Sequence, residues 1–340
     1  MEQIRENTNN SISLEEREAL VDMPVDAVRE VPTQEKKQSM DAQLVALGKL
    51  FEGSHIRWVL DGARTISFMK GSYIGIHKDV DISIEKNEIT KIHKHLEQNG
   101  YGLFLNYPKD LNDPKSRVVM ERIKTDTGRS LSLGELMIIA IDDKGFVTKD
   151  KHLNFIDVHV INRDQAGEPV GLGGTTLPRE WFEFQTTQFQ GTEIHASHPA
   201  KVAYFKLHND RARDMADLHE LAKIGMLSDA DVSSLEEVCR EESQAREDSV
   251  RLFLKGVFSR VASSMSAETI FEILATEPAA KDTYQRNPAL LKNIAEAMYH
   301  NMNNQELVVH GVCEILGFPQ RDKKMKLKIE QVRQWMKGGN

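Results

Sequence analysis

Two aspartates separated by one residue are the first feature of this sequence that suggests chemistry. Residues 77–84 read HKDVDISI, in which polar and apolar residues alternate from Asp79 onward. Alternate side chains of a β-strand project to the same face, so Asp79 and Asp81 share one face and the valine and isoleucines share the other. Neighbouring carboxylates repel each other unless a cation lies between them, and oxygen ligands of this kind suit Mg²⁺. The spacing predicts a magnesium site on one face of a strand.

A second stretch repeats this alternation. Residues 154–161 read NFIDVHVI, which places Asp157 on the face opposite the apolar Ile156 and Val158. If the two strands are neighbours, three carboxylates converge. Such a cluster can hold two divalent ions that bind a triphosphate, orient an attacking hydroxyl and stabilise the leaving pyrophosphate. The alternative is that acids on an edge strand only keep that strand soluble.

The elements that must position these acids follow a mixed order of strands and helices. Helical spacing begins near Ser39, short strands and helices alternate up to residue 161, and FEFQTTQFQGTEIHA predicts a hairpin that turns at Gly191. From Pro199 onward the periodicity is almost entirely helical. The sequence therefore predicts an α/β (α+β) domain with a mixed sheet, followed by an all-α C-terminal domain. The predicted divisions are a mobile acidic arm at 1–38, a catalytic domain at 39–198, helices completing it at 199–228, and the α-helical domain at 229–340.

Composition narrows the class of protein. The 340 residues are 40% hydrophobic and 28% charged, which is typical of a globular protein with more than one domain. A net charge of -8 argues against a general DNA or RNA binder. Cys239 and Cys313 are too far apart in sequence to indicate a disulfide framework or a zinc site. The chain has no apolar leader and no long apolar run, so we expect a cytoplasmic location and no contact with membranes.

The order of motifs resembles one known superfamily. Residues 58–84, WVLDGARTISFMKGSYIGIHKDVDISI, combine a strand, a turn, a helix, a glycine, a short loop and H-x-D-x-D leading into an apolar strand. This order resembles the nucleotidyltransferase superfamily typified by DNA polymerase β, and within it the aminoglycoside, lincosamide and toxin-type nucleotidyltransferases. Downstream, FIDVHVI resembles that group's third-carboxylate strand, GTEIHASHPAKVAYFKL its hairpin, proline and helix, and RARDMADL its R-x-K-D-x-x-D-L helix. The resemblance covers residues 55–225 in the correct order.

This resemblance implies an enzyme that uses Mg²⁺ and an NTP, with ATP as the expected nucleotide. Asp79, Asp81 and Asp157 would be metal ligands, and Asp157 would ligate metal or act as general base for the acceptor hydroxyl. Backbone N–H groups at the start of a helix would meet the triphosphate. The residues implied in nucleotide binding are Gly62, Ala63, Arg64, His77, Lys78, Lys206 and Arg213.

Three departures from the family pattern affect phosphate binding. Ala63 follows Gly62 where relatives have a second glycine or a serine. Gly75 stands where relatives often have an arginine, so Lys78 or Arg64 would have to supply that charge. The helix carries RARD instead of R-x-K-D, which keeps a positive charge but changes its shape.

Other motifs allow a functional and a structural interpretation. His77 either contacts nucleotide or fixes a turn, and His159 either orients the acceptor or makes a structural hydrogen bond. The charges of residues 211–217 also suit ordinary helical ion pairs, such as Arg213 with Asp217. The stretch GEPVGLGGTT lacks the features of a P-loop and is interpreted as a mobile loop over the site. The basic segment RDKKMKLKIEQVRQWMK is either a solvated helix face or a contact surface for RNA or an acidic partner.

The leading hypothesis is transfer of a nucleoside monophosphate from an NTP to a hydroxyl acceptor. The protein's acidity favours a cationic small molecule such as an aminoglycoside or lincosamide as acceptor. The long helical region and its basic end favour a macromolecule, either tRNA or a protein. The alternative from a different class is a non-catalytic module that binds a nucleotide or a partner, motivated by Ala63 and Gly75.

Overall fold

The fold is described from a computed structural model. The structure describes residues 30–76, 79–108, 118–123, 135–209, 211–262, 264–276 and 287–338. Most of the predicted acidic arm lies outside these residues. Its last residues do not belong to an arm, because helix α2 (Gln34–Phe51) begins at Gln34, where the Thr33 side chain accepts a hydrogen bond from the N–H of Lys36.

A mixed sheet forms the centre of the α/β region. In the described residues it has nine strands in the order β4-β3-β5-β6-β2-β1-β9-β8, with β7 paired to β6. β2 runs parallel to β6 and β1 parallel to β9, while the other pairs are antiparallel. This confirms the predicted mixed sheet. The strands are β1 (Trp58–Leu60), β2 (Val80–Glu85), β3 (Tyr101–Pro108), β4 (Val118–Arg122), β5 (Glu135–Ala140), β6 (Phe155–Arg163), β7 (Pro169–Val170), β8 (Phe184–Phe189) and β9 (Thr192–Ser197).

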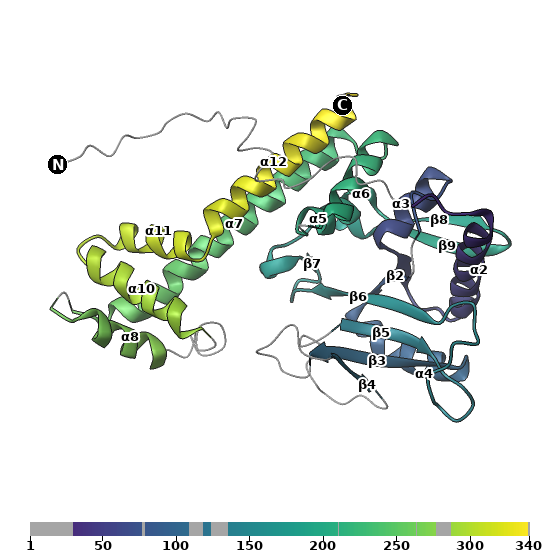
Figure 1. Ribbon diagram of the computed structural model, residues 1–340, viewed down its shortest axis with the longest axis horizontal. Helices are drawn as coiled ribbons and strands as arrows, with labels where there is room; N and C mark the ends of the chain where they lie inside the picture. Colours follow the sequence, from purple (N-terminus) through teal and green to yellow (C-terminus); the bar gives the residue numbers. More distant parts are fainter. Residues whose placement is uncertain are drawn as a thin grey trace.

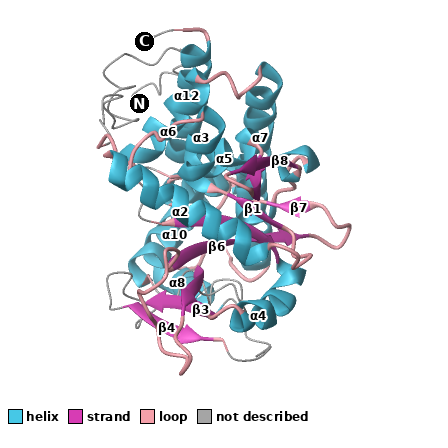
Figure 2. Ribbon diagram, turned by 90° about the vertical axis from the view of Figure 1, so that its right-hand side faces the viewer, coloured by secondary structure: helices cyan, strands magenta, loops and turns pink. Residues whose placement is uncertain are grey.

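Helices pack against the sheet, and the C-terminal region is helical, as predicted. Figure 2 shows α5, α6, α7 and α12 gathered at one end of the molecule, with β3 and β4 at the opposite end. No helix in the described residues has the length and apolar character needed to cross a membrane. The remaining helices are α3 (Gly62–Lys70), α4 (Ile89–Gln98), α5 (Pro199–Leu207), α6 (Ala212–Lys223), α7 (Asp229–Phe258), α8 (Ala267–Thr276), α10 (Pro288–Asn301), α11 (Gln305–Ile315) and α12 (Phe318–Met336), with short 3₁₀ turns η1 (Lys86–Glu88), η3 (Leu172–Gly174) and η4 (Arg179–Phe182).

The apolar face of β2 anchors the strand that carries the aspartates. Val80, Ile82 and Ile84 are each at most 1% exposed and belong to a core that also contains residues of α2 and α4. Burying three branched side chains on one face fixes the register of β2, because a slip by one residue would bring the acids into the core. The predicted alternation is therefore confirmed, and it determines which way Asp81 points.

The predicted hairpin turn is also confirmed. β8 and β9 pair from Phe184↔Ser197 to Phe189↔Thr192, which leaves Gln190 and Gly191 as the two-residue turn. Both turn residues have positive φ, 46° and 83°, as a tight hairpin requires. The hairpin brings the end of β9 and the start of α5 beside β1.

The helix α7 belongs to two hydrophobic cores. It is 30 residues long and begins with a capping box formed by Ser228 and Asp231. Its first half packs with α5, α6 and α12, and its second half packs with α8, α10 and α11. Figure 1 shows α12 running alongside α7 and back toward the sheet. The proposed division of the chain at residue 229 stays a prediction.

The basic C-terminal segment is not simply a solvated helix face. Lys328 on α12 is 2% exposed and donates hydrogen bonds to the carbonyl oxygens of Leu207, 2.9 Å, and Asn209, 2.7 Å. These carbonyls lie at the end of α5, where cations stabilise the negative end of the helix dipole. Arg333 pairs with Glu236 on α7. α12 therefore uses two of its bases to hold α5 and α7.

Lys328→Met should lower the free energy of unfolding by about 1–3 kcal/mol, because it removes two charge-assisted hydrogen bonds and leaves buried carbonyls without this donor. The control is Lys326→Met on the same helix, where the side chain is exposed. Urea unfolding followed by circular dichroism gives both values. Equal midpoints for the two variants would contradict a structural role for Lys328.

Candidate active site

Three carboxylates meet on one face of the sheet. Asp81 and Asp157 are direct partners in the parallel pairing of β2 with β6, and Asp79 immediately precedes β2. One oxygen atom of each of the three lies within 4.8 Å of the others. The structure thus brings together the three acids that the sequence singled out.

The electrostatics of Asp81 fit a cation at this position. Burial is the main cause that raises the pKa of Asp81 to about 6, and the charges of Asp79 and Asp61 act in the same direction, while His159 and Lys206 oppose them. Hard oxygen donors at this separation are suited to a divalent cation such as Mg²⁺, which would relieve the repulsion.

Gly62 lies against one of these acids. It is the first residue of α3 and has a positive φ of 63°. A Cβ atom at Gly62 would lie 2.1 Å from Oδ2 of Asp81, closer than any side chain could approach. Glycine is therefore required twice, for its backbone conformation and for the space beside Asp81. The start of α3 and its N–H groups come directly to the acid cluster as a result.

Ala63 and Arg64, predicted at the nucleotide, are both buried. Ala63 is 7% exposed and Arg64 only 1% exposed. The guanidinium of Arg64 donates to the carbonyl oxygens of Asp79 and Met40, each 3.2 Å away, and to the Gln43 side chain. These hydrogen bonds hold the backbone of Asp79 against α2, and a contact between Arg64 and phosphate stays a prediction.

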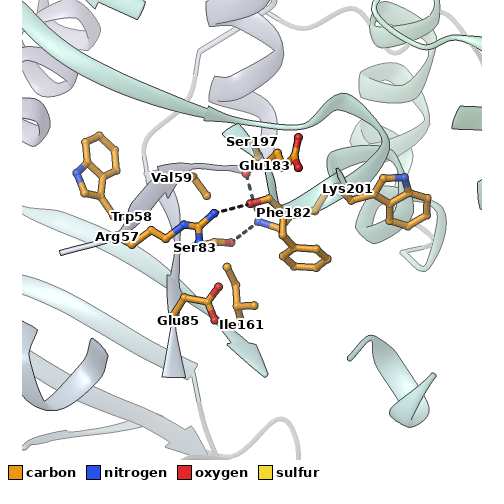
Figure 3. Close-up of a pocket in the computed structure, with 11 residues that line it drawn as sticks. Arg57, Trp58, Val59, Ser83, Glu85, Ile161, Phe182, Glu183, Ser197 and Lys201 are labelled. Carbon is orange, nitrogen blue, oxygen red and sulfur yellow. Dashed lines mark hydrogen bonds between the residues drawn. The ribbon is translucent and has the colours of Figure 1, made fainter. Parts of the chain in front are cut away.

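Asp61 forms a buried network that the sequence did not reveal. It is 2% exposed, and its Oδ1 accepts the N–H of Gly62 at 3.0 Å. Its Oδ2 accepts hydrogen bonds from Lys201 Nζ at 2.9 Å and from the Ser83 hydroxyl. Lys201, also 2% exposed, donates to the hydroxyls of Ser83 and Ser197 at 2.7 and 3.2 Å, and these three side chains lie together in Figure 3. The network joins α3, β2, β9 and α5.

Charge within this network keeps Asp61 ionised. Burial opposes ionisation, yet Lys201 and His159 hold the pKa of Asp61 well below its usual range. From the sequence alone, Lys201 would be expected to be an exposed residue of its helix, because lysine is rarely buried without a partner. The only sequence signal was an aspartate at the end of a strand and immediately before a helix, the position of an N-cap.

His159 is the network's exposed member. Its Nδ1 lies 3.2 Å from Oδ2 of Asp61, and half of its side chain is exposed. Burial lowers the pKa of His159, but the hydrogen bond and charge of Asp61 and the charge of Asp81 together raise it above its ordinary value. Nδ1 of His159 therefore makes the structural hydrogen bond that was one of the two interpretations of this residue.

A cluster of ion pairs lies at the helical side of the site. Lys206 Nζ contacts Asp214 Oδ1 at 2.9 Å and Asp217 Oδ2 at 2.8 Å, and both acids have side chains that are 0% exposed. Arg211 Nε contacts Asp214 Oδ2 at 2.6 Å and keeps half of its side chain exposed. The positive charge of Lys206 is close enough to lower the pKa of Asp81. Arg211 is a cation near the site that the sequence analysis assigned only to helical pairing.

The other predicted nucleotide contacts remain predictions. Arg213 is an exposed residue of α6. His77 and Lys78 lie outside the described residues. The glycine-rich stretch was predicted to be a loop over the site, and the N–H of Leu172 within it donates to the Tyr204 hydroxyl at 2.9 Å.

A small hollow continues the polar face of β2 beyond the acids. It lies between β1, β2 and η4, where Arg57 donates to the carbonyl oxygen of Phe182 at 3.3 Å (Figure 3). Glu85 on its lining is paired with Arg163, whose Nε lies 2.9 Å from Oε2. The polar face of β2 therefore extends past Ser83 to Glu85, whose charge is paired with Arg163.

Comparison with known proteins agrees with this geometry. Residues 43–126 match the sequence profile of the aminoglycoside-2''-adenylyltransferase family. The match contains Gly62, Asp79 and Asp81 and ends before Asp157. This part of the chain is similar to a family of nucleotidyltransferases. No curated protein matches its sequence.

Two crystal structures of nucleotidyltransferase type resemble parts of the chain. The lincomycin-bound lincosamide antibiotic adenylyltransferase LnuA is 17% identical, with 57% of this chain and 99% of LnuA covered at a TM-score of 0.35. An antigenic nucleotidyltransferase-like protein from Paracoccidioides brasiliensis is 11% identical, with 62% and 90% covered at a TM-score of 0.33. Both TM-scores are below 0.5.

Gly62→Ala should displace Asp81 and weaken metal binding. The control is Gly71→Ala at the other end of α3, where φ is also positive, 68°, but no atom lies within 4 Å of the added Cβ. Both variants should lose roughly 1–2 kcal/mol of stability through backbone strain. Only Gly62→Ala should also lower Mn²⁺ affinity, by on the order of tenfold, the size expected when a ligand is no longer held in place. Isothermal titration with Mn²⁺ tests this, and equal affinities for both variants would contradict the contact with Asp81.

Asp81→Asn should stabilise the metal-free protein above pH 6. A carboxyl whose pKa rises from 3.8 to about 6 on folding holds its proton more tightly when folded, so stability falls as pH rises through this window. The variant should therefore exceed the wild type by about 1–2 kcal/mol at about pH 7.5, less than the full shift implies because water screens a partly exposed group. The difference should vanish below about pH 4. Urea unfolding with chelator present gives these values, and adding Mg²⁺ should stabilise the wild type more than the variant.

Proposed function

We propose that this chain transfers a nucleoside monophosphate from an NTP to a hydroxyl group and releases pyrophosphate. The observation that carries the proposal is the convergence of Asp79, Asp81 and Asp157 within 4.8 Å. They lie beside a helix that starts at Gly62. Carboxylates this close to one another repel, which costs stability unless a cation lies between them. A site that binds divalent ions requires such closeness. The relation to nucleotidyltransferases supports the same reaction.

Each part of the site has a role in this proposal. Bound Mg²⁺ would neutralise the acids and stabilise the charge that develops on the transferred phosphoryl group. The three aspartates would hold it, with Asp157 serving as a metal ligand or as the base that accepts the proton of the acceptor hydroxyl. The start of α3 presents N–H groups to the triphosphate, since α3 begins beside Asp81. Lys206 and Arg211, with Arg213, supply positive charge from α5 and α6.

ATP is the proposed nucleotide, and a small hydroxyl-bearing molecule of the aminoglycoside type is the proposed acceptor. The family whose profile matches residues 43–126 is described as adenylating aminoglycosides at the 2'' position. The basic C-terminal segment gives less support to tRNA or another macromolecule than its sequence suggested, since Lys328 is buried and Arg333 is paired. A cytoplasmic location remains part of this proposal.

Asp79→Ala, Asp81→Ala and Asp157→Ala should each lower pyrophosphate release by about 100-fold or more, the scale of losing a group that stabilises developing charge. The assay combines purified protein, Mg²⁺, each of the four NTPs, and either an aminoglycoside, lincomycin or water as acceptor. The control is Asp143→Ala, an exposed acid on the connection between β5 and β6. Transfer of label from [α-³²P]NTP to the acceptor identifies the product.

Two results would contradict the proposal. Wild-type turnover in the variants of Asp79 and Asp81 would show that the acids do not carry the reaction. Nucleotide binding by the wild type without pyrophosphate release would favour the non-catalytic module that Ala63 and Gly75 suggest. Calorimetry with Mg²⁺ and each NTP separates binding from turnover.

A further inference from the structure

His159 lies where a substrate of the proposed reaction would meet it. On β6 it is two residues beyond Asp157 and therefore on the same face of the sheet. Its register partner on β2 is Ser83, while the partner of Asp157 is Asp81. The imidazole reaches Asp61, which follows β1 on the other side of β2.

The Asp61 network is buried except for the side chain of His159. Asp61, Ser83 and Lys201 are each at most 2% exposed, whereas half of the His159 side chain is exposed. A carboxylate accepts hydrogen bonds, so Nδ1 of His159 carries the hydrogen that Asp61 binds. This bond fixes the ring, and Nε2 then lies on the side of the ring away from Asp61. A histidine held in this way presents one nitrogen in a defined direction.

We propose that His159 Nε2 contacts the attacking hydroxyl of the acceptor, with Asp61 as the positioning residue that orients the ring. This inference rests on the proposed function. It assigns a use to the one half-exposed side chain of a network that is otherwise buried, beside the acids that would hold the metal.

The groups suited to phosphate and the groups proposed to act on the acceptor come from different strands of the sheet. The groups suited to phosphate, namely the start of α3, Lys206 and Arg211, come from elements that follow β1 and β9. In the sheet, β1 and β9 lie on one side of β2, and β6 lies on the other. His159 shares β6 with Asp157, the acid proposed to act on the acceptor. The backbone of His159 thus lies on the strand of Asp157, while its imidazole reaches across β2 to Asp61, the residue before α3.

Two substitutions of His159 separate contact with substrate from support of Asp61. The amide nitrogen of asparagine can occupy the position of Nδ1, so His159→Asn keeps the hydrogen bond to Asp61 and removes the outer end of the ring. Glutamine reaches the position of Nε2, so His159→Gln keeps a polar atom at the outer end and loses the bond to Asp61. His152→Asn is the control, since this histidine is exposed on the loop before β6. Pyrophosphate release is measured with Mg²⁺ and each NTP, using water, lincomycin or an aminoglycoside as acceptor.

We expect His159→Asn to fold with the thermal midpoint of the wild type and to lose at least about tenfold in kcat/KM for the acceptor. Its affinity for α,β-methylene-ATP with Mn²⁺ should stay within about twofold of the wild type, because the lost contact is not with the nucleotide. His159→Gln should retain more turnover than His159→Asn even if it is less stable. The control should match the wild type throughout.

Three outcomes would overturn the inference. His159→Asn with wild-type turnover, or with more turnover than His159→Gln, would mean that the bond to Asp61 is the whole role of the residue. A fall in nucleotide affinity of about tenfold or more in His159→Asn would place the imidazole on the nucleotide side instead. A wild type that releases no pyrophosphate with any NTP and acceptor would overturn the proposed function, and this inference with it, which distinguishes that failure from the first two.

Discussion

The buried ion pair between Asp61 and Lys201 is the interaction on which the arrangement of this site depends. Removing two charges from water costs several kcal/mol, and their attraction compensates only when hydrogen bonds satisfy the remaining polar atoms. Here the carboxylate also accepts the N–H of Gly62 and the Ser83 hydroxyl, and the ammonium also donates to Ser83 and Ser197. The pair therefore joins the start of α3 to β2, β9 and α5 at one point.

The position of this pair determines how closely the start of α3 approaches the three aspartates proposed to bind metal. Asp61 holds Gly62 by its N–H, and the backbone N–H of Asp61 donates to the carbonyl oxygen of Asp81 at 2.8 Å. With no side chain at Gly62, the helix start lies in contact with the Asp81 carboxylate. A helix start carries partial positive charge, so the same contact that brings α3 to Asp81 also offsets some of the repulsion among the acids.

The C-terminal helices α7 and α12 hold α5, which supplies two lysines near the site. α5 supplies Lys201 near its start and Lys206 near its end, and Lys328 of α12 binds the carbonyl oxygens at the end of α5. A second buried network connects α5 to α7, because the Tyr204 hydroxyl donates to Glu242, and the His208 ring lies 2.7 Å from the same carboxylate. The helical region thus holds α5, which supplies Lys201 to the Asp61 network and Lys206 near Asp81. This gives the first half of α7 and the whole of α12 a structural connection to the α/β region.

The sequence by itself determined the mixed sheet, the helical C-terminal region, the hairpin turn at Gly191 and the face of β2 that carries the acids. These features follow from local patterns: alternation with period two, helical periodicity, and a turn whose residues need positive φ. The convergence of Asp157 with Asp79 and Asp81 was a conditional prediction, since it required β2 and β6 to be neighbours. Only the tertiary structure decided that they pair, because the residues that pair are about 75 positions apart in the chain and local periodicity does not encode partners. For the same reason the sequence did not reveal that Arg64 and Lys201 are buried, since the burial of a charged side chain depends on partners that arrive from distant elements.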